Sequence, residues 1–209
     1  MKKVLVLLMK GLFGLGFLVF LMLFSSCEEN SGDVDEYQDW KGKNESYFQN
    51  VYLKADSVIH AGGNNWKIIR KWSLLEQFGD KKENNIVVHV LENGGASAMP
   101  IYTDSVVVDI EGRLMPATCD EKGAVFYTSF SGKDRNLKQD LKVTISAKGS
   151  LFNHEIDGLS TALQKMHIGD RWLIYVPSNL ALQGQSLSSP FIPSYSTLIF
   201  DITLLGIKH

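Results

Sequence analysis

Residues Ile156–Met166 read IDGLSTALQKM, and this stretch decides the fold. Its apolar side chains recur three or four positions apart, which is the spacing of one buried face on a helix. They are Ile156, Leu159, Leu163 and Met166. Residues His167–Asp170 then form a turn, and Arg171–Val176 return to the alternation of a strand. The sequence therefore predicts a short apolar helix that leads directly into a sheet.

On both sides of this helix, short runs with a period of two predict strands separated by turns. The expected strands are Trp66–Leu75, Ile86–Glu92, Ser105–Met115, Val125–Phe130, Leu141–Ala147, Arg171–Val176 and Thr197–Ile207. Several strands around one short apolar helix predict an α+β domain with a mostly antiparallel sheet packed on that helix. One domain with an N-terminal extension accounts for the 209 residues.

A second helix is predicted near the N-terminus, over Ser46–His60, where apolar residues again recur at helical spacing. These residues are Phe48, Val51, Tyr52, Ala55, Val58 and Ile59. We favour packing of this stripe against the body of the protein, and a partner-binding face is the alternative. The preceding stretch, Glu28–Glu45, is polar, acidic and poor in aliphatic residues, which predicts a flexible tether.

The N-terminus has the pattern of an exported lipoprotein. Met1–Lys3 is a short cationic start, Gly11–Phe24 is uncharged and apolar, and Ser25–Cys27 follows. A charged start, an apolar run of roughly 7–15 residues and a small-residue boundary make up a secretory signal peptide. Ser25–Cys27 resembles the lipobox of bacterial lipoproteins, which implies a lipid on Cys27 and a place in the cell envelope, with the outer membrane expected. A retained membrane span is the alternative, because the apolar run counted from Val4 approaches the roughly 20 residues that cross a bilayer.

Composition argues against several classes of function. The formal net charge is −2, whereas nucleic-acid-binding proteins are basic, so no nucleic-acid partner is expected. With Cys27 lipidated, Cys119 is the only other cysteine, so no internal disulfide can form, and we expect a structural rather than a reactive thiol. The five histidines form no HExxH motif and no pair at ligand spacing, so no metal or other cofactor is expected. Asp109 and Glu111 share one strand face, where we expect them to be solvated rather than catalytic.

Several segments, in order, resemble the FKBP-type peptidyl-prolyl isomerase family. Val106–Leu114 (VVVDIEGRL) is similar to the family's V-x-V-x-Y-x-G-x-L strand, and Ile156–Met166 to its I-x-G-W-x-x-A-L-x-x-M helix. His167–Pro177 resembles the V-G-x-x … I-P segment that follows. Asn179–Leu182 and Phe191–Leu205 resemble its L-A-Y-G loop and its I-P-x-x-x-x-L-x-F-x-x-x-L-L ending. The resemblance implies a half-open antiparallel sheet packed on a short central helix.

With the resemblance, the expected organisation has four parts. They are a signal peptide at 1–26, a flexible acidic tether at 27–45, an N-terminal helix and strand extension at 46–85, and an FKBP-like domain at 86–209.

The resemblance also implies a prolyl pocket of eight residues. They are Ile110, Phe126, Tyr127, Ile156, Leu159, Leu182, Ile192 and Phe200. Four of them match the family, whereas Ile110, Tyr127, Leu159 and Leu182 stand where it has tyrosine, aspartate, tryptophan and tyrosine. Leu182 cannot donate the hydrogen bond that the family's tyrosine gives to the bound peptide carbonyl, and Glu155 places a charge beside a normally aliphatic wall.

An apolar pocket suits prolyl isomerisation. A peptide bond rotates over a barrier of about 18–20 kcal/mol. No bond is broken, so preferential binding of the twisted amide is sufficient without a nucleophile or a metal. We therefore expect a membrane-anchored FKBP-like protein that acts on proline-containing or unfolded polypeptides, as an isomerase with an eroded pocket or as a folding chaperone. The alternative is a non-catalytic cell-surface binding module with the same fold.

Overall fold

The computed structural model describes residues 37–75, 81–117, 120–130 and 142–209. Within these residues, seven strands form one antiparallel sheet in the order β1-β2-β8-β11-β3-β4, with β5 also paired to β3. The strands are β1 (Trp66–Arg70), β2 (Asn85–Glu92), β3 (Ser105–Leu114), β4 (Val125–Thr128), β5 (Val143–Ser146), β8 (Arg171–Val176) and β11 (Leu198–Lys208). This antiparallel sheet confirms the predicted α+β class.

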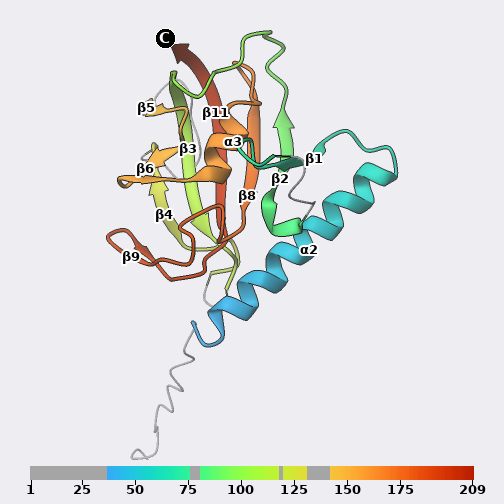
Figure 1. The fold of residues 1–209 in the computed structure, drawn as a ribbon, viewed down its shortest axis with the longest axis vertical. Coiled ribbons are helices and arrows are strands. Elements are labelled where there is room, and N and C mark those ends of the chain that lie inside the picture. Colours follow the sequence, from blue (N-terminus) through green and yellow to red (C-terminus); the bar gives the residue numbers. More distant parts are fainter. Residues whose placement is uncertain (1–36, 76–80, 118–119, 131–141) are drawn as a thin grey trace, which may run out of the picture. The chain divides into compact units, whose positions relative to one another are not determined.

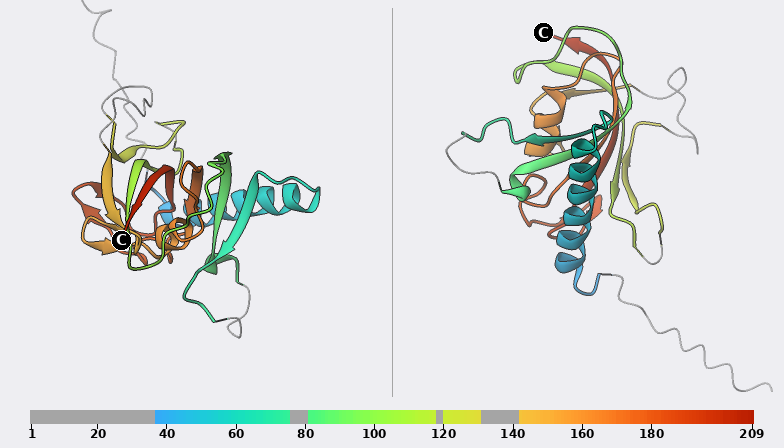
Figure 2. Two further views of the ribbon diagram at one scale, coloured as in Figure 1. Left: turned by 90° about the horizontal axis from the view of Figure 1, so that it is seen from above. Right: turned by 90° about the vertical axis from the view of Figure 1, so that its right-hand side faces the viewer.

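Helices and two small hairpins complete the described fold. They are α2 (Trp40–His60), the 3₁₀ helix η3 (Lys82–Asn84), the hairpin β6 (Ser150–Leu151) and β7 (His154–Glu155), α3 (Asp157–Leu163), and the hairpin β9 (Leu187–Ser188) and β10 (Phe191–Ile192). Figure 1 shows α3 lying across the sheet and α2 running beside β1 and β2. The two further views in Figure 2 also place α2 along this end of the sheet.

One face of the sheet packs on α3 and forms the main core. Alternate residues of β11 point to this face, and Leu198, Phe200, Ile202 and Leu204 are all fully buried, as the alternation predicts. The helix approaches so closely that a Cβ on Gly158 would lie 2.4 Å from a methyl group of Val176. The helix stripe predicted from Ile156–Met166 is likewise fully buried, although α3 itself spans only Asp157–Leu163.

The opposite face of the sheet is covered at one end by α2. Phe48 and Ala55 of the helix pack with Trp66 of β1 and Val87 of β2 in a second hydrophobic cluster. The other members of the predicted stripe, Val51, Tyr52 and Val58, pack against the same cluster, whereas Ile59 is exposed. Packing against the body, rather than a free partner-binding face, is therefore confirmed for most of the stripe.

The helix begins earlier than predicted, within the stretch that was predicted to be a tether. α2 starts at Trp40, not at Ser46, so the second part of the stretch expected to be a tether is helical. Trp40 and Asn44 are both buried, two turns and one turn before Phe48 on the same side of the helix. Asn44 is polar, and its burial depends on hydrogen bonds to a distant loop. Periodicity of apolar residues therefore could not reveal this part of the helix.

The first strand also differs from the prediction. β1 ends at Arg70 rather than at Leu75, because Lys71 turns away to pair with Asp157 at the start of α3, with Nζ 2.7 Å from the carboxylate. The register Trp66↔His89 to Arg70↔Asn85 makes β1 an edge strand of the main sheet. The strand that we placed in an N-terminal extension is therefore part of the same sheet as the predicted FKBP-like domain.

Several predictions concern residues outside this part of the chain. The expected signal peptide at 1–26, Cys27 and Cys119 all lie outside the described residues. In the described ranges, no helix is both long and apolar enough to cross a membrane.

The packing of α2 gives one testable prediction, for His89. Its ring stacks on Trp66 with centroids 4.5 Å apart, and the Lys54 ammonium lies 5.3 Å from the Trp66 centroid. Burial, and secondly the charge of Lys54, hold the pKa of His89 below its ordinary value of 6.5. Because protonation is disfavoured in the folded state, the neutral ring contributes stability above pH 6.5, and this contribution is lost as pH falls through the lowered pKa.

We expect an NMR titration of the imidazole protons to place the pKa of His89 below 6.5. Lys54→Met should raise it part of the way, because burial remains. Lys67→Met, on the opposite face of β1, should leave it unchanged. A pKa at or above 6.5 in the unsubstituted protein would contradict the prediction.

Candidate functional site

The structure brings the eight residues of the predicted pocket together. They come from six places in the fold: β3, β4, the start of α3, the turn before β9, β10 and β11. Six of the eight are buried in the main hydrophobic cluster, and Phe126 and Tyr127 are partly buried against it. The spatial cluster therefore includes every residue that the sequence analysis named.

Two aromatic rings meet over a glycine on the α3 side of the sheet. Phe126 and Phe200 pack edge to face, with centroids 5.8 Å apart at 90°. A Cβ on Gly112 would lie 2.5 Å from the Phe126 ring and 3.2 Å from that of Phe200. Only glycine leaves room for both rings at this point. A bulge contributes to the arrangement, because Gly112 pairs with Tyr127 and Arg113 pairs with Val125, which leaves Phe126 as the extra residue.

The sequence analysis missed a third aromatic residue, Phe152. It packs edge-on against Phe126, with centroids 6.2 Å apart, and against Tyr127, with centroids 5.4 Å apart. Phe152 and Asn153 form the tight turn between β6 and β7 with φ of 52° and 63°. Two consecutive positive φ angles are typical of the hairpin turns that favour Asn and Gly, and phenylalanine is unusual there. The sequence therefore offered no clear signal for Phe152.

Tyr127 is partly buried and packs against Phe152. Burial raises the pKa of Tyr127 above its ordinary value of 10.0. With Phe126, these side chains form a partly exposed aromatic group in contact with the fully buried Phe200. Such a group can contact an apolar ligand, and its phenol offers a hydrogen-bond donor near the rings.

Leu159 and Leu182 provide only aliphatic contact. Leu159 is fully buried in α3, and Leu182 is buried in the turn that follows β8. The two segments are joined where the Gly158 amide donates a 2.8 Å hydrogen bond to the Leu180 carbonyl. Glu155, at the end of β7, is exposed.

Two cavities lie along α2, away from the eight residues. One, of about 580 Å³, lies between the first half of α2 and the segment Met115–Ala117. The other, of about 350 Å³, lies between α2, η3, and the segments Pro177–Asn179 and Tyr195–Thr197. None of the eight predicted pocket residues lines either cavity. In this structure the eight residues therefore belong to the main hydrophobic core or pack against it, and Phe126 and Phe200 are in direct contact.

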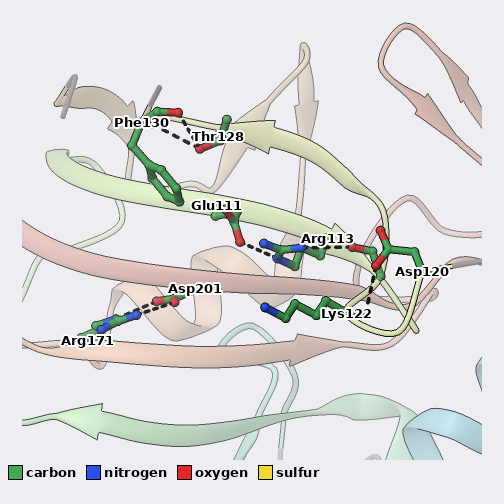
Figure 3. A network of polar contacts seen from close by, with 9 residues as sticks. Glu111, Arg113, Asp120, Lys122, Thr128, Phe130, Arg171 and Asp201 are labelled. Atoms are coloured by element: carbon green, nitrogen blue, oxygen red, sulfur yellow. Dashed lines mark hydrogen bonds and ion pairs between the residues drawn. The ribbon is translucent and has the colours of Figure 1, made fainter. Parts of the chain in front are cut away.

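The other face of the sheet carries charges that pair with one another (Figure 3). Arg171 donates two hydrogen bonds to the Asp201 carboxylate, at 2.9 and 3.1 Å, and lies 3.4 Å from Glu92. The hydrogen bonds to Asp201 raise the pKa of Arg171 although burial opposes them. Arg113 pairs with Glu111 and also donates to the Gly123 carbonyl at 3.2 Å. These pairs fit a structural role.

The expectation that Asp109 and Glu111 are solvated is wrong. Asp109 is 1 % exposed, and the Ser129 hydroxyl donates to it at 2.5 Å. Glu111 forms an ion pair with Arg113, and its side chain is only 12% exposed. Ser129, directly after β4, is the partner of Asp109, and Arg113 of the same strand is the partner of Glu111. The sequence pattern does not reveal these partners, which make the burial possible. In the described residues no group of three or more His, Cys, Asp or Glu side chains could hold a metal ion.

A sequence model of the FKBP-type peptidyl-prolyl cis-trans isomerase family matches residues 97–205, which is more than half of the chain. The chain belongs to this family. The match begins after β2 and runs from β3 into β11, and it includes all eight residues of the predicted pocket.

Curated relatives agree with this assignment. The FKBP-type 22 kDa peptidyl-prolyl cis-trans isomerase of Escherichia coli is 32% identical over 115 residues, which cover 55% of this chain and 47% of the relative. The outer membrane protein MIP of Legionella longbeachae is 29% identical over 116 residues, which cover 56% of this chain and 42% of the relative. The chain spans about half the length of the curated relatives that it matches.

A solved structure supports the fold. The crystal structure of FkpA from Escherichia coli has a TM-score of 0.51 and 22% sequence identity, covering 83% of this chain and 63% of that chain. The similarity is one of fold. It agrees with the FKBP-like sheet and central helix predicted from the sequence.

Proposed function

We propose that this FKBP-family chain binds proline-containing or unfolded polypeptides at the bacterial cell envelope, and that its prolyl isomerase turnover is weak. The observation that carries the proposal is that all eight predicted residues lie in or against the main hydrophobic core, with Phe126 and Phe200 packed edge to face. Aromatic and aliphatic side chains at one place favour a proline ring by apolar contact.

Weak turnover follows from the side chains at two positions. Leu159 and Leu182 are aliphatic and buried, so the site lacks a tryptophan floor and a hydrogen-bond donor at these points. Only interactions that strengthen in the transition state accelerate a reaction, so binding can survive while catalysis falls.

A binding titration tests the proposal. We expect the full-length protein in detergent micelles to show NMR shift changes at the amides of Phe126, Ile156 and Ile192 when a proline-containing tetrapeptide is added. A matched peptide with alanine in place of proline should give weaker changes at the same amides. If neither peptide perturbs them, the cluster is only core and the proposal is wrong.

A non-catalytic binding module is the second candidate. The contacts of Phe152 with Phe126 and Tyr127 favour it, because a third ring packed on these two leaves less of their surface free to contact a proline ring. Peptide binding in the titration without measurable turnover would select this candidate.

Anchoring through Cys27 is part of the proposal and rests on the apolar run that ends at Ser25–Cys27. The name of the Legionella longbeachae relative, an outer membrane protein, supports it. We expect Cys27→Ser to move the protein out of the membrane fraction or to leave it unprocessed, and to abolish labelling by a radioactive fatty acid. Cys119→Ser is the matched control and should remain labelled. Labelling that persists in Cys27→Ser would show that the lipid is elsewhere or absent.

A further inference from the structure

The first two turns of α2 contact a single loop of the FKBP-family domain. This loop, Phe191–Thr197, begins with β10 and ends just before β11. The Trp40 indole N–H donates a buried 2.9 Å hydrogen bond to the Ser196 hydroxyl. That hydroxyl in turn donates to the Pro193 carbonyl at 2.7 Å, so the contact extends into the middle of the loop.

Asn44, one turn further along α2, holds the end of the same loop. Its side-chain oxygen accepts a 2.7 Å hydrogen bond from the Thr197 amide, and its NH₂ group donates to the Trp40 carbonyl at 2.7 Å. The side chain is 1 % exposed. Burial of an amide is favourable only when its donors and acceptors are paired, so the position requires both the loop amide and the helix carbonyl.

Aromatic contacts hold the beginning of the loop. The Tyr37 ring packs edge-on against Trp40, with centroids 5.0 Å apart, and against Phe191, with centroids 5.5 Å apart. The Lys41 ammonium lies 4.9 Å from the centroid of the Tyr195 ring. The segment Tyr37–Asn44 therefore contacts the loop near its start, in its middle and at its end.

The same loop carries a residue of the predicted pocket. Ile192 is fully buried in the main hydrophobic cluster, one residue after Phe191 and one before Pro193. A binding wall on a loop is less well defined than one on a helix or a sheet, and neighbouring contacts are needed to hold it. The contacts from α2 supply such support from outside the matched part of the family.

We propose that Trp40 and Asn44 are positioning residues, which hold the loop Phe191–Thr197 so that Ile192 is kept in place for polypeptide binding. This inference rests on the proposed function. It assigns to the start of α2 a role in setting the affinity of the site, in addition to its packing on the sheet. A loop already held in its bound conformation loses less conformational freedom when a ligand binds.

The test compares two variants with a control in the full-length protein in detergent micelles. Trp40→Phe removes the N–H group that reaches Ser196 but keeps an aromatic ring beside Tyr37. Asn44→Ala removes the acceptor for the Thr197 amide. Val58→Ala removes a side chain that packs on the sheet at the other end of α2, far along the helix from the loop. Circular dichroism checks that each variant remains folded.

Two quantities are measured for each protein, the NMR hydrogen exchange rate of the Thr197 amide and the affinity for a proline-containing tetrapeptide. We expect Asn44→Ala to raise the exchange rate and to weaken affinity, each by about tenfold, the factor that corresponds to ~1.4 kcal/mol. Trp40→Phe should act in the same direction on affinity. Where turnover is measurable, KM should rise and kcat should change little. Val58→Ala should lower the melting temperature without changing affinity.

The outcomes separate this inference from the proposed function. Unchanged affinity in both variants, with faster exchange at Thr197, would show that the contacts are only structural and would overturn the inference while leaving the proposed function intact. Unchanged exchange in Asn44→Ala would overturn it as well. If the unsubstituted protein binds no peptide, the proposed function is wrong. The role of Trp40 and Asn44 in affinity is then wrong as well. A loss of affinity in Val58→Ala equal to that in Asn44→Ala would show a general effect of loosening α2, which also contradicts the inference.

Discussion

The full-length protein should catalyse prolyl isomerisation of a tetrapeptide at a rate close to the uncatalysed background. In the proposed pocket, Leu159 would give no aromatic contact to the proline ring, and Leu182 would donate no hydrogen bond. Each loss costs about 1–3 kcal/mol of transition-state binding, or roughly 10–200-fold in rate. The measurement is kcat/KM in a protease-coupled or NMR exchange assay. A value equal to that of a family member with the full set of pocket side chains would contradict the eroded pocket.

Restoring both side chains tests the same idea in the other direction. Leu159→Trp together with Leu182→Tyr should raise kcat/KM by at least about tenfold. Because Leu159 is fully buried, the larger ring must displace its neighbours, at a cost of about 1–3 kcal/mol. We therefore expect a melting temperature lower by several degrees, at about 2–4 °C for each kcal/mol. Leu173→Tyr, on the other face of β8, is the control and should not change turnover. A double variant that folds and gains no activity would argue against these two positions.

The largest loss of stability is expected from Phe200→Ala. Phe200 is fully buried in β11, and its removal leaves a cavity beside Phe126 and Gly112. Truncating a buried phenylalanine to alanine costs about 3–5 kcal/mol of unfolding free energy. The edge-to-face contact with Phe126, at 5.8 Å, is lost at the same time. Urea denaturation followed by tryptophan fluorescence measures the change.

Phe191→Ala is the matched control for this variant. Phe191 is 57 % exposed and lies on the short strand β10, so its loss should cost less than about 1 kcal/mol. The two variants remove the same side chain from the same part of the chain. Equal destabilisation would show that burial of Phe200 is not what holds this side of the sheet together.

Local patterns were sufficient for much of the fold. The stripe Ile156–Met166 and the alternation in Thr197–Ile207 predicted α3 and β11. In each, the buried residues recur with the period of the backbone, every three or four residues in the helix and every second residue in the strand. Ile86–Val88 lie in a strand that is buried on both faces, since α2 covers one and α3 the other. Its continuous apolar run was still recognisable as a strand.

The pocket residues were predictable for a different reason. Six of them lie in segments that resemble the family at several positions at once, so their place in the fold came with the segment. Phe126 and Tyr127 were placed only by their correspondence to a phenylalanine and an aspartate of the family. Phe152 lies between such segments, in a turn where its φ is unusual for phenylalanine. Its contacts with Phe126 and Tyr127 depend on how the hairpin β6–β7 packs against β3–β4. This packing cannot be predicted from a local sequence pattern.

The sequence by itself determined the α+β class, the family and the central helix, and it named eight residues that lie in or against the main core. These depend on apolar periodicity and on local motifs, which each segment carries alone. Only the tertiary structure decided that α2 begins at Trp40, that Asp109 is buried, and that Asn44 reaches the loop before β11. All three are polar or isolated side chains whose burial is favourable only when a partner distant in the sequence supplies a hydrogen bond or a ring contact. Such partners come within contact distance only when the apolar faces of the chain have packed together.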